Sequence, residues 1–221
     1  EDYKLNLDTK ATLVSFLSTK FPGHQTITEA GNSLTELKDL LSTLGIDSLP
    51  QSFIQKRDKV DPATILGKGK LIEIAEYAKK NKSTLLALDA ELTAGQIIKI
   101  KKLTKMDVID RCTIILEIFA RHARTSESRL QVEIARLEYL LPRLKAYWTH
   151  FSRQRGGIGL KSGEGEKQIE LDRRMVKDRI ISLKNKIELL SKQRFEQRKN
   201  RSKKTIVAAL VGYTNTGKSS I

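Results

Sequence analysis

The stretch TLLALD at residues 84–89 decides the fold of the amino-terminal half of the chain. It is an unbroken apolar run of strand length that ends in a carboxylate. Such runs are typical of strands buried on both faces of a parallel sheet. Three further strands are predicted at residues 11–18, 47–57 and 107–110. The strand at 47–57 is the least certain of these predictions, because Pro50 has no amide hydrogen to donate and fits only an edge strand or the first residue of a strand.

Helical patterns alternate with these strands. Ser33, with Glu36 at capping-box spacing, predicts the start of a helix that Gly45 ends. Two more helices are predicted at residues 70–81 and 93–103 from their apolar spacing. The order β-α-β-α-β-α-β predicts an α/β N-terminal domain with a mostly parallel sheet.

The pattern becomes purely helical after Cys112. Residues 112–123 are apolar and helical, and two runs with heptad spacing follow. Pro142 is expected to kink or end the first run, and residues 156–165 hold five glycines in ten positions, which excludes a stable helix there. Two long amphipathic helices joined by a glycine-rich tip predict an antiparallel helical hairpin. The heptad positions are Leu130, Ile134, Leu137, Leu141, Leu144 and Trp148, then Ile169, Val176, Ile180, Leu183, Ile187 and Leu190.

Positive charge is concentrated on this hairpin. The 221 residues carry a net charge of +15. Residues 121–204 hold 23 Lys/Arg against 10 Asp/Glu, whereas residues 1–120 hold 17 against 16. A strongly basic segment next to a nearly neutral one predicts that the basic segment binds an anionic partner. The alternative is a charged helical face that stays solvated.

Composition excludes several classes of protein. One cysteine, Cys112, excludes an internal disulfide framework and fits a reducing compartment. Three histidines without ligand spacing make a structural zinc site a poor interpretation. No apolar run is long enough to span a bilayer, and the first ten residues lack the features of a secretory signal.

A phosphate-binding motif follows the hairpin. Residues 205–212 predict a buried strand, and Gly212–Ser219 matches G-x-x-x-x-G-K-[ST] directly after it. In that context Lys218 is the predicted catalytic residue facing the β- and γ-phosphates, and Ser219 the predicted Mg²⁺ ligand. A purely structural turn is the alternative. The predicted nucleotide-binding residues are Gly212, Tyr213, Thr214, Asn215, Thr216, Gly217, Lys218, Ser219 and Ser220.

Two further features leave alternatives open. The side-chain oxygen of Asn215 suits a K⁺ ion, and GxxNxGKS resembles the loop of potassium-activated GTPases of the translation-factor class. Alternatively, asparagine tolerates the tight loop conformation without any ion.

Gly67–Lys70 either cradles a phosphate or forms a turn that opens a helix, and we favour the turn, because the spacing of a phosphate loop is incomplete.

From about Val60 onward the sequence resembles the HflX GTPases, a family of ribosome-associated proteins. Gly163-Glu164-Gly165-Glu166 departs from the family's Gly-Pro-Gly-Glu, with no proline and one extra residue of spacing, and the first sixty residues match loosely. The strings that carry the resemblance are DPATILGKGK at 61–70, VIDR at 108–111, ILEIFARHART at 115–125, LQVEIARLEYLLPRL at 130–144, RQRGGIG at 153–159, GEKQIELDRRM at 165–175 and GYTNTGKSS at 212–220.

The resemblance implies an N-terminal α/β domain, a helical hairpin and then a P-loop GTPase domain, which we place at residues 1–111, 112–204 and 205–221. It implies GTP and GDP as ligands, and a cytoplasmic, monomeric protein whose hairpin binds the large ribosomal subunit and its rRNA and which separates subunits under stress. The RNA-binding candidates are Arg153, Arg155, Gly156, Gly157, Lys161, Lys167, Arg173 and Arg174.

Hydrolysis needs switch segments, a further acidic residue at the Mg²⁺ site and a base-recognition loop, all expected after Ile221. We therefore expect this chain alone not to turn over GTP. A nucleotide-independent RNA-binding or scaffold module, with the phosphate loop as a stub, is the alternative function.

Overall fold

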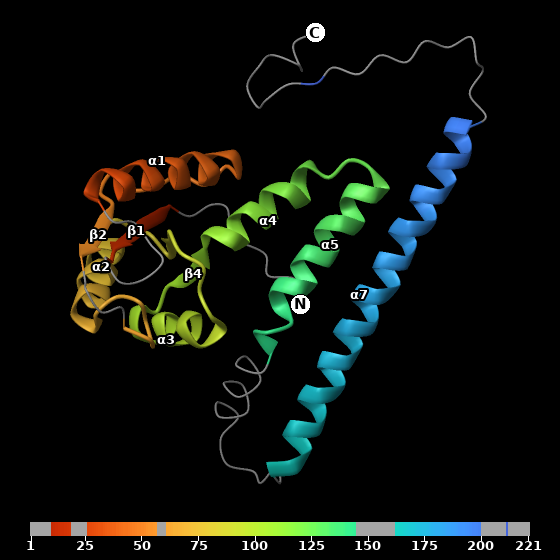
Figure 1. Cartoon of the computed structure of the whole chain (residues 1–221). Coiled ribbons are helices and arrows are strands. Elements are labelled where there is room, and N and C mark those ends of the chain that lie inside the picture. The colour runs from red at the N-terminus through yellow and green to blue at the C-terminus, as the bar shows by residue number, and fades with distance from the viewer. Residues whose placement is uncertain (1–9, 19–25, 57–60, 145–161, 200–210, 212–221) are drawn as a thin grey trace.

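Four short strands form one sheet in which every neighbouring pair is parallel, in the order β2-β1-β3-β4 (Figure 1). This confirms the fold predicted from the alternating pattern. The strands are β1 (Ala11–Leu17), β2 (Phe53–Lys56), β3 (Leu85–Leu88) and β4 (Asp107–Asp110). The computed structural model describes residues 10–18, 26–56, 61–144, 162–199 and Val211.

The sheet has helices on both faces (Figure 1). On β3, Leu85 and Ala87 pack with α1 and α4, whereas Leu86 and Leu88 pack with α2 and α3. All four side chains are at most 2% exposed, which explains the unbroken apolar run, since burial stabilises each leucine by about 2 kcal/mol. The helices are α1 (Ile27–Thr43), α2 (Lys68–Lys80), α3 (Ala94–Thr104) and α4 (Arg111–His122).

One predicted helix start was wrong. Helix α1 begins at Ile27, and its capping box is formed by Thr26 and Glu29 rather than by Ser33 and Glu36. The amide of Glu29 donates to the Thr26 hydroxyl over 3.1 Å, which satisfies an amide that the first helical turn leaves without a partner. The predicted end was right, because Gly45 adopts a left-handed φ of 75°.

The helical hairpin is present. Helix α4 leads into α5 (Ser126–Leu140), and α7 (Ser162–Lys199) packs against α5 through its middle part, from Val176 to Ile187 (Figure 1). The first heptad helix ends just before Pro142, as predicted. Residues 145–161, which hold most of the glycine-rich tip, lie outside the described part of the chain.

The prediction that 156–165 excludes a helix was wrong at its carboxyl end, because Ser162–Gly165 is the first turn of α7. Each glycine costs about 1 kcal/mol relative to alanine there. A helix of 38 residues tolerates this cost in its first turn. Among the described helices, none is both long and apolar enough to cross a bilayer.

Candidate functional site

Most of the predicted functional residues lie outside the described part of the chain. This holds for the whole nucleotide-binding set at 212–220 and, at the tip, for Arg153, Arg155, Gly156, Gly157 and Lys161. Lys167 lies in α7, but its side chain is not described. Arg173 and Arg174 follow in α7, Arg173 partly buried and Arg174 exposed. The described part of the site is therefore the hairpin and its junction with the α/β domain.

The hairpin is held together by an apolar seam. Ile134 of α5 packs against Ile180 and Leu183 of α7, and Leu183 is fully buried. The surrounding seam positions were predicted from the heptad spacing, and these contacts confirm them. They are Leu130, Leu137, Leu141, Val176 and Ile187.

Ion pairs flank the seam and use up the acidic side chains of α5. Glu133 accepts from Arg179 over 2.8 Å, Glu138 accepts from Lys184 over 2.8 Å, and Glu127 pairs with Arg194. These pairs are largely exposed, so each contributes little stability, at most about 1 kcal/mol. Their consequence is that α5 has no acidic side chain left to neutralise the rest of α7.

A basic surplus remains on α7. Six of its side chains form no ion pair with any residue that the structure describes: Arg173, Arg174, Lys177, Lys186, Arg198 and Lys199. The helix rises about 57 Å over its length. Positive charge is thus distributed along an extended rod, a form suited to a polyanion.

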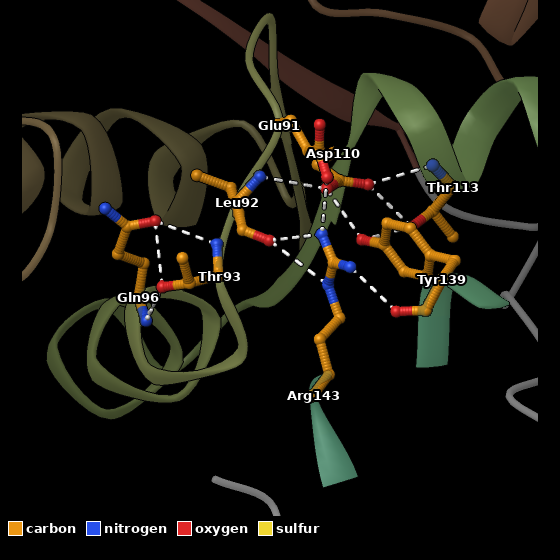
Figure 2. Close-up of polar contacts among 8 residues, drawn as sticks. All are labelled: Glu91, Leu92, Thr93, Gln96, Asp110, Thr113, Tyr139 and Arg143. Atoms are coloured by element: carbon orange, nitrogen blue, oxygen red, sulfur yellow. Dashed lines mark hydrogen bonds and ion pairs between the residues drawn. The ribbon is translucent and has the colours of Figure 1, made fainter. Parts of the chain in front are cut away.

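The rod is joined to the α/β domain through a buried carboxylate, Asp110, at the end of β4 (Figure 2). Its Oδ1 accepts from the amide (2.9 Å) and the hydroxyl (2.6 Å) of Thr113. Its Oδ2 accepts from the amide of Leu92 (3.0 Å) and from the hydroxyl of Tyr139 (2.7 Å). One side chain therefore links β4, the loop after β3, α4 and α5.

Arg143 forms the second half of this junction. Its guanidinium donates to the carbonyl of Leu92 over 2.8 Å and to the carbonyl of Tyr139 over 2.7 Å, and it pairs with Glu91 over 3.1 Å (Figure 2). The guanidinium carbon lies 3.4 Å from the centroid of the Tyr139 ring. Arg143 is only 7% exposed, and its planar group suits several acceptors at once.

Burial and the hydrogen bond to Asp110 both raise the pKa of Tyr139. Both effects favour the neutral phenol, because an ionised phenolate beside a carboxylate would repel it in a poorly solvated site. The Tyr139 hydroxyl is therefore a stable donor to Asp110 over the physiological pH range.

A further polar group lies at the carboxyl end of β3. The carboxylate of Asp89 is buried and accepts from the Ser15 hydroxyl (3.1 Å) and from Arg111 (3.0 Å). Arg111 also donates to Ser33 and pairs with Glu36 of α1. Ser33 and Glu36, which the sequence analysis assigned to a helix cap, instead tie α1 to the start of α4.

Sequence reasoning did not foresee the junction residues as a group. Asp110 and Arg143 are 33 positions apart; Asp110 was noted only as the last residue of a predicted strand and within a string of family resemblance, and Arg143 only within such a string. Two signals could have found them: a carboxylate that directly follows a buried strand, and an arginine that follows Pro142 inside an apolar run. The Gly67–Lys70 stretch opens a helix, as favoured, but no separate turn precedes it: Gly67 is the N-cap of α2, Lys68–Lys70 lie in its first turn, and Lys70 pairs with Glu73 over 2.7 Å within that helix.

Two family models match the chain. The model described as GTP-binding GTPase N-terminal matches residues 31–120, and the one described as GTP-binding GTPase Middle Region matches residues 122–201. Solved structures with a similar fold include the complex of SsGBP with GDP, with a TM-score of 0.53 and 23% identity over 96% of this chain and 54% of that one. A GTP-binding protein from Sulfolobus solfataricus in complex with GDP gives a TM-score of 0.51 and 22% identity over 83% of this chain and 46% of that one. These identities show likeness of fold alone.

Curated relatives are more similar in sequence. The chain is 47% identical to the GTPase HflX of Flavobacterium psychrophilum over 85% of its own length and 45% of the relative's. It is 42% identical to that of Escherichia coli (85% and 44%) and 41% identical to that of Spirochaeta thermophila (90% and 49%). The chain thus spans about half the length of the curated relatives that it matches. Both adjacent family models and these relatives agree: the chain belongs to the HflX family of GTPases, of which it carries the N-terminal and middle regions.

Proposed function

We propose that the full-length protein is a cytoplasmic GTP hydrolase that binds the large ribosomal subunit and its rRNA through the basic hairpin, and that it separates or rescues ribosomes under stress. One observation carries the RNA part of the proposal. After α5 has paired all its acidic side chains, α7 keeps six basic side chains without an ion pair in the described part of the chain. RNA is bound largely through its phosphates, and such an array suits them.

The junction supports this proposal through rigidity. Buried hydrogen bonds of Asp110 and Arg143 tie α5 to β4 and to the loop after β3, and the hairpin projects from the α/β domain beside them (Figure 1). A rigid projection loses less conformational entropy on binding than a flexible one. We propose that Arg153, Arg155 and Lys161 of the tip contact RNA as well.

The nucleotide part of the proposal rests on the loop at 212–220 and on the relatives. The curated relatives carry the name GTPase HflX, and two solved structures of similar fold are complexes with GDP. Hydroxyl and amide oxygens are hard ligands, so Ser219 fits Mg²⁺ and Asn215 fits an accessory K⁺. The bound Mg²⁺ would neutralise charge on the β- and γ-phosphates, and Lys218 would contribute a second positive charge there.

We place the functional units at residues 1–111, 112–204 and 205–221 and propose that the protein acts as a monomer. The last unit is the start of a GTPase domain that the rest of the protein would complete. Hydrolysis is therefore assigned to the full-length protein, whereas RNA binding is assigned to the hairpin and needs no nucleotide.

The test is co-sedimentation of the chain with large ribosomal subunits in the absence of nucleotide. Replacing Arg173, Arg174 and Lys177 by glutamine should move most of the protein from the pellet to the supernatant. The control variant replaces Lys38, Lys68 and Lys99, three exposed lysines of the α/β domain, and changes the net charge equally. Equal pelleting of both variants would show that the hairpin charge has no specific role.

One observation favours a second candidate, a protein-binding scaffold. Helix α7 exposes Leu171, Met175, Ile181 and Leu189 on the side away from Leu183, each more than half exposed. An apolar stripe on an exposed helix face is a common binding surface for another protein. Loss of ribosome binding on replacing Met175 and Leu189 by serine, with the basic variant unaffected, would favour this candidate.

A further inference from the structure

The helices α1, α2 and α3 all end at the amino-terminal edge of the sheet. Each is followed by one residue in the left-handed region: Gly45 (φ 75°), Lys82 (φ 55°) and Lys105 (φ 59°). Glycine adopts this conformation without strain, whereas a side chain with a Cβ is disfavoured there. The ends of α2 and α3 thus carry lysine at positions where the backbone favours glycine.

The hydrogen bonds at the end of α2 show that glycine would serve equally well there. After α2, the amide of Lys82 donates to the carbonyl of Lys79 (3.2 Å) and the amide of Ser83 to that of Ala78 (2.9 Å). Helix α1 ends in the same two-bond pattern with Gly45 in the place of Lys82. The lysine side chain is therefore not required to terminate the helix.

The two lysine-bearing ends lie next to each other. Helices α2 and α3 pack together on the same face of the sheet, and the amide of Asp107 donates to the carbonyl of Thr84 over 2.8 Å, so the loops that follow the two helices run side by side. This brings six exposed lysines to one edge, which we name the lysine edge: Lys79, Lys80, Lys82, Lys101, Lys102 and Lys105.

The helix dipole alone does not account for the lysine edge. Lysines in a last turn do interact favourably with the negative end of a helix. Yet α1 ends at the same edge of the sheet with no basic residue in its last turn. Only Lys101 is neutralised, by Asp107 over 2.7 Å. The other five form no ion pair with a described residue.

We propose that the lysine edge is a second RNA-binding surface, separate from the hairpin, which holds the phosphate backbone of structured RNA. The inference rests on the proposed function in taking RNA as the partner. Lysine ammonium groups contact phosphates as point charges and read no bases. Among the described residues, the edge offers no exposed aromatic ring for base stacking and a single exposed large apolar side chain, Leu103, for insertion into a lipid surface.

The position of the lysine edge gives it a distinct role. The hairpin leaves the domain through Asp110 and Arg111, at the carboxyl end of β4, so the lysine edge lies at the opposite edge of the sheet. Two basic surfaces at opposite ends of a rigid body would hold two separate RNA segments of one particle. The second contact then forms at high effective concentration and strengthens the first.

The test uses Lys82→Gly with Lys105→Gly in the same chain. These changes remove two positive charges. They also remove the backbone strain of two lysines in the left-handed region, so the variant should melt at a higher temperature than the wild type. Its affinity for a fluorescein-labelled 20-base-pair RNA duplex should fall several-fold, and the salt slope should flatten by about two units. The control, Lys38→Gln with Lys68→Gln, removes the same charge elsewhere.

The outcomes separate cleanly. A more stable double-glycine variant with weaker RNA binding than the control supports the inference. An RNA affinity and a salt slope equal to those of the control would overturn it. It would also be overturned if the double-glycine variant lost binding to phosphatidylserine vesicles but kept its affinity for RNA. If the hairpin variant at Arg173, Arg174 and Lys177 binds like the wild type while the double-glycine variant does not, the hairpin proposal fails and the lysine edge stands.

Discussion

The hydroxyl of Tyr139 donates a 2.7 Å hydrogen bond to the carboxylate of Asp110 and so joins the last turn of α5 to the carboxyl end of β4 in the parallel sheet. Asp110 is fully buried and has four donors in all. A buried carboxylate is stable only when its oxygens are satisfied. The orientation of the hairpin therefore depends on a few hydrogen bonds.

Tyr139→Phe should lower the free energy of unfolding by about 1–3 kcal/mol, because it removes one of the two donors to the buried Oδ2 of Asp110 and leaves only the Leu92 amide there, while preserving the ring. Urea denaturation followed by circular dichroism measures this. Tyr77→Phe is the matched control, since the Tyr77 hydroxyl has no hydrogen bond within the described residues. Similar small effects of both changes would show that the Tyr139 hydrogen bond contributes nothing measurable to the free energy of unfolding.

The same residue predicts a pH dependence. Burial and Asp110 raise the pKa of Tyr139 in the folded protein, whereas an unfolded tyrosine ionises near pH 10. The folded state holds the phenolic proton more tightly, so this stabilisation is complete below about pH 10 and is lost as the pH rises beyond it. Between pH 9 and 11 the wild type should lose more stability than Tyr139→Phe. Parallel losses in both proteins would contradict the assignment.

Leu183→Ala should destabilise the hairpin by about 2–5 kcal/mol, because Leu183 is fully buried between α5 and α7. Leu189→Ala lies two turns away on the same helix, with a side chain 58% exposed, and should change stability by no more than about 0.5 kcal/mol. Thermal melting of both variants gives the comparison. A Leu183→Ala protein that melts like Leu189→Ala would argue against the seam.

Two glycines, Gly31 inside α1 and Gly45 just after its end, should respond in opposite directions. A Cβ at Gly31, inside α1, meets nothing within 4 Å, so Gly31→Ala should raise the unfolding free energy by about 0.5–1 kcal/mol. Gly45 has equal space but a φ of 75°, so Gly45→Ala should lower stability by about 1 kcal/mol. Chemical denaturation decides between these signs, and the same sign for both changes would refute the assigned end of α1.

Lys218→Ala tests the nucleotide-binding loop in the full-length protein. Loss of the cation that faces the β- and γ-phosphates should reduce ribosome-stimulated GTP hydrolysis by at least about a hundredfold, since catalysis of phosphoryl transfer is mainly electrostatic. The assay is steady-state phosphate release with Mg²⁺ present. Hydrolysis at the wild-type rate would show that Lys218 is not part of the catalytic site.

The sheet and the hairpin seam could be predicted from sequence because both depend on local periodicity. The apolar run TLLALD predicts that both faces of β3 are covered by helices. The heptad spacing around Leu183 predicts the apolar contacts between α5 and α7. The start of α1 was misassigned because two capping-box patterns compete within ten residues, at Thr26 and at Ser33. Only tertiary contacts, from Arg111 to Ser33 and Glu36, separate them.

The junction could not be predicted, because it depends on contacts between residues far apart in sequence. Leu92, Asp110 and Arg143 meet only once the sheet is formed and α4 has turned the chain back. Local rules also do not reveal a lysine at a left-handed position, since such rules favour glycine for that conformation. Both features therefore come from the three-dimensional structure alone.

The central claim is that the basic hairpin binds ribosomal RNA. Its most direct test is the affinity of the chain for large ribosomal subunits across a salt series, for the wild type and for a variant with Arg153, Arg155 and Lys161 replaced by glutamine. Binding should need no nucleotide, and log affinity should fall linearly with log salt. In the variant, affinity should drop and the slope should flatten by about one unit for each lost phosphate contact. A folded variant, verified by circular dichroism, with wild-type affinity and slope would contradict the claim.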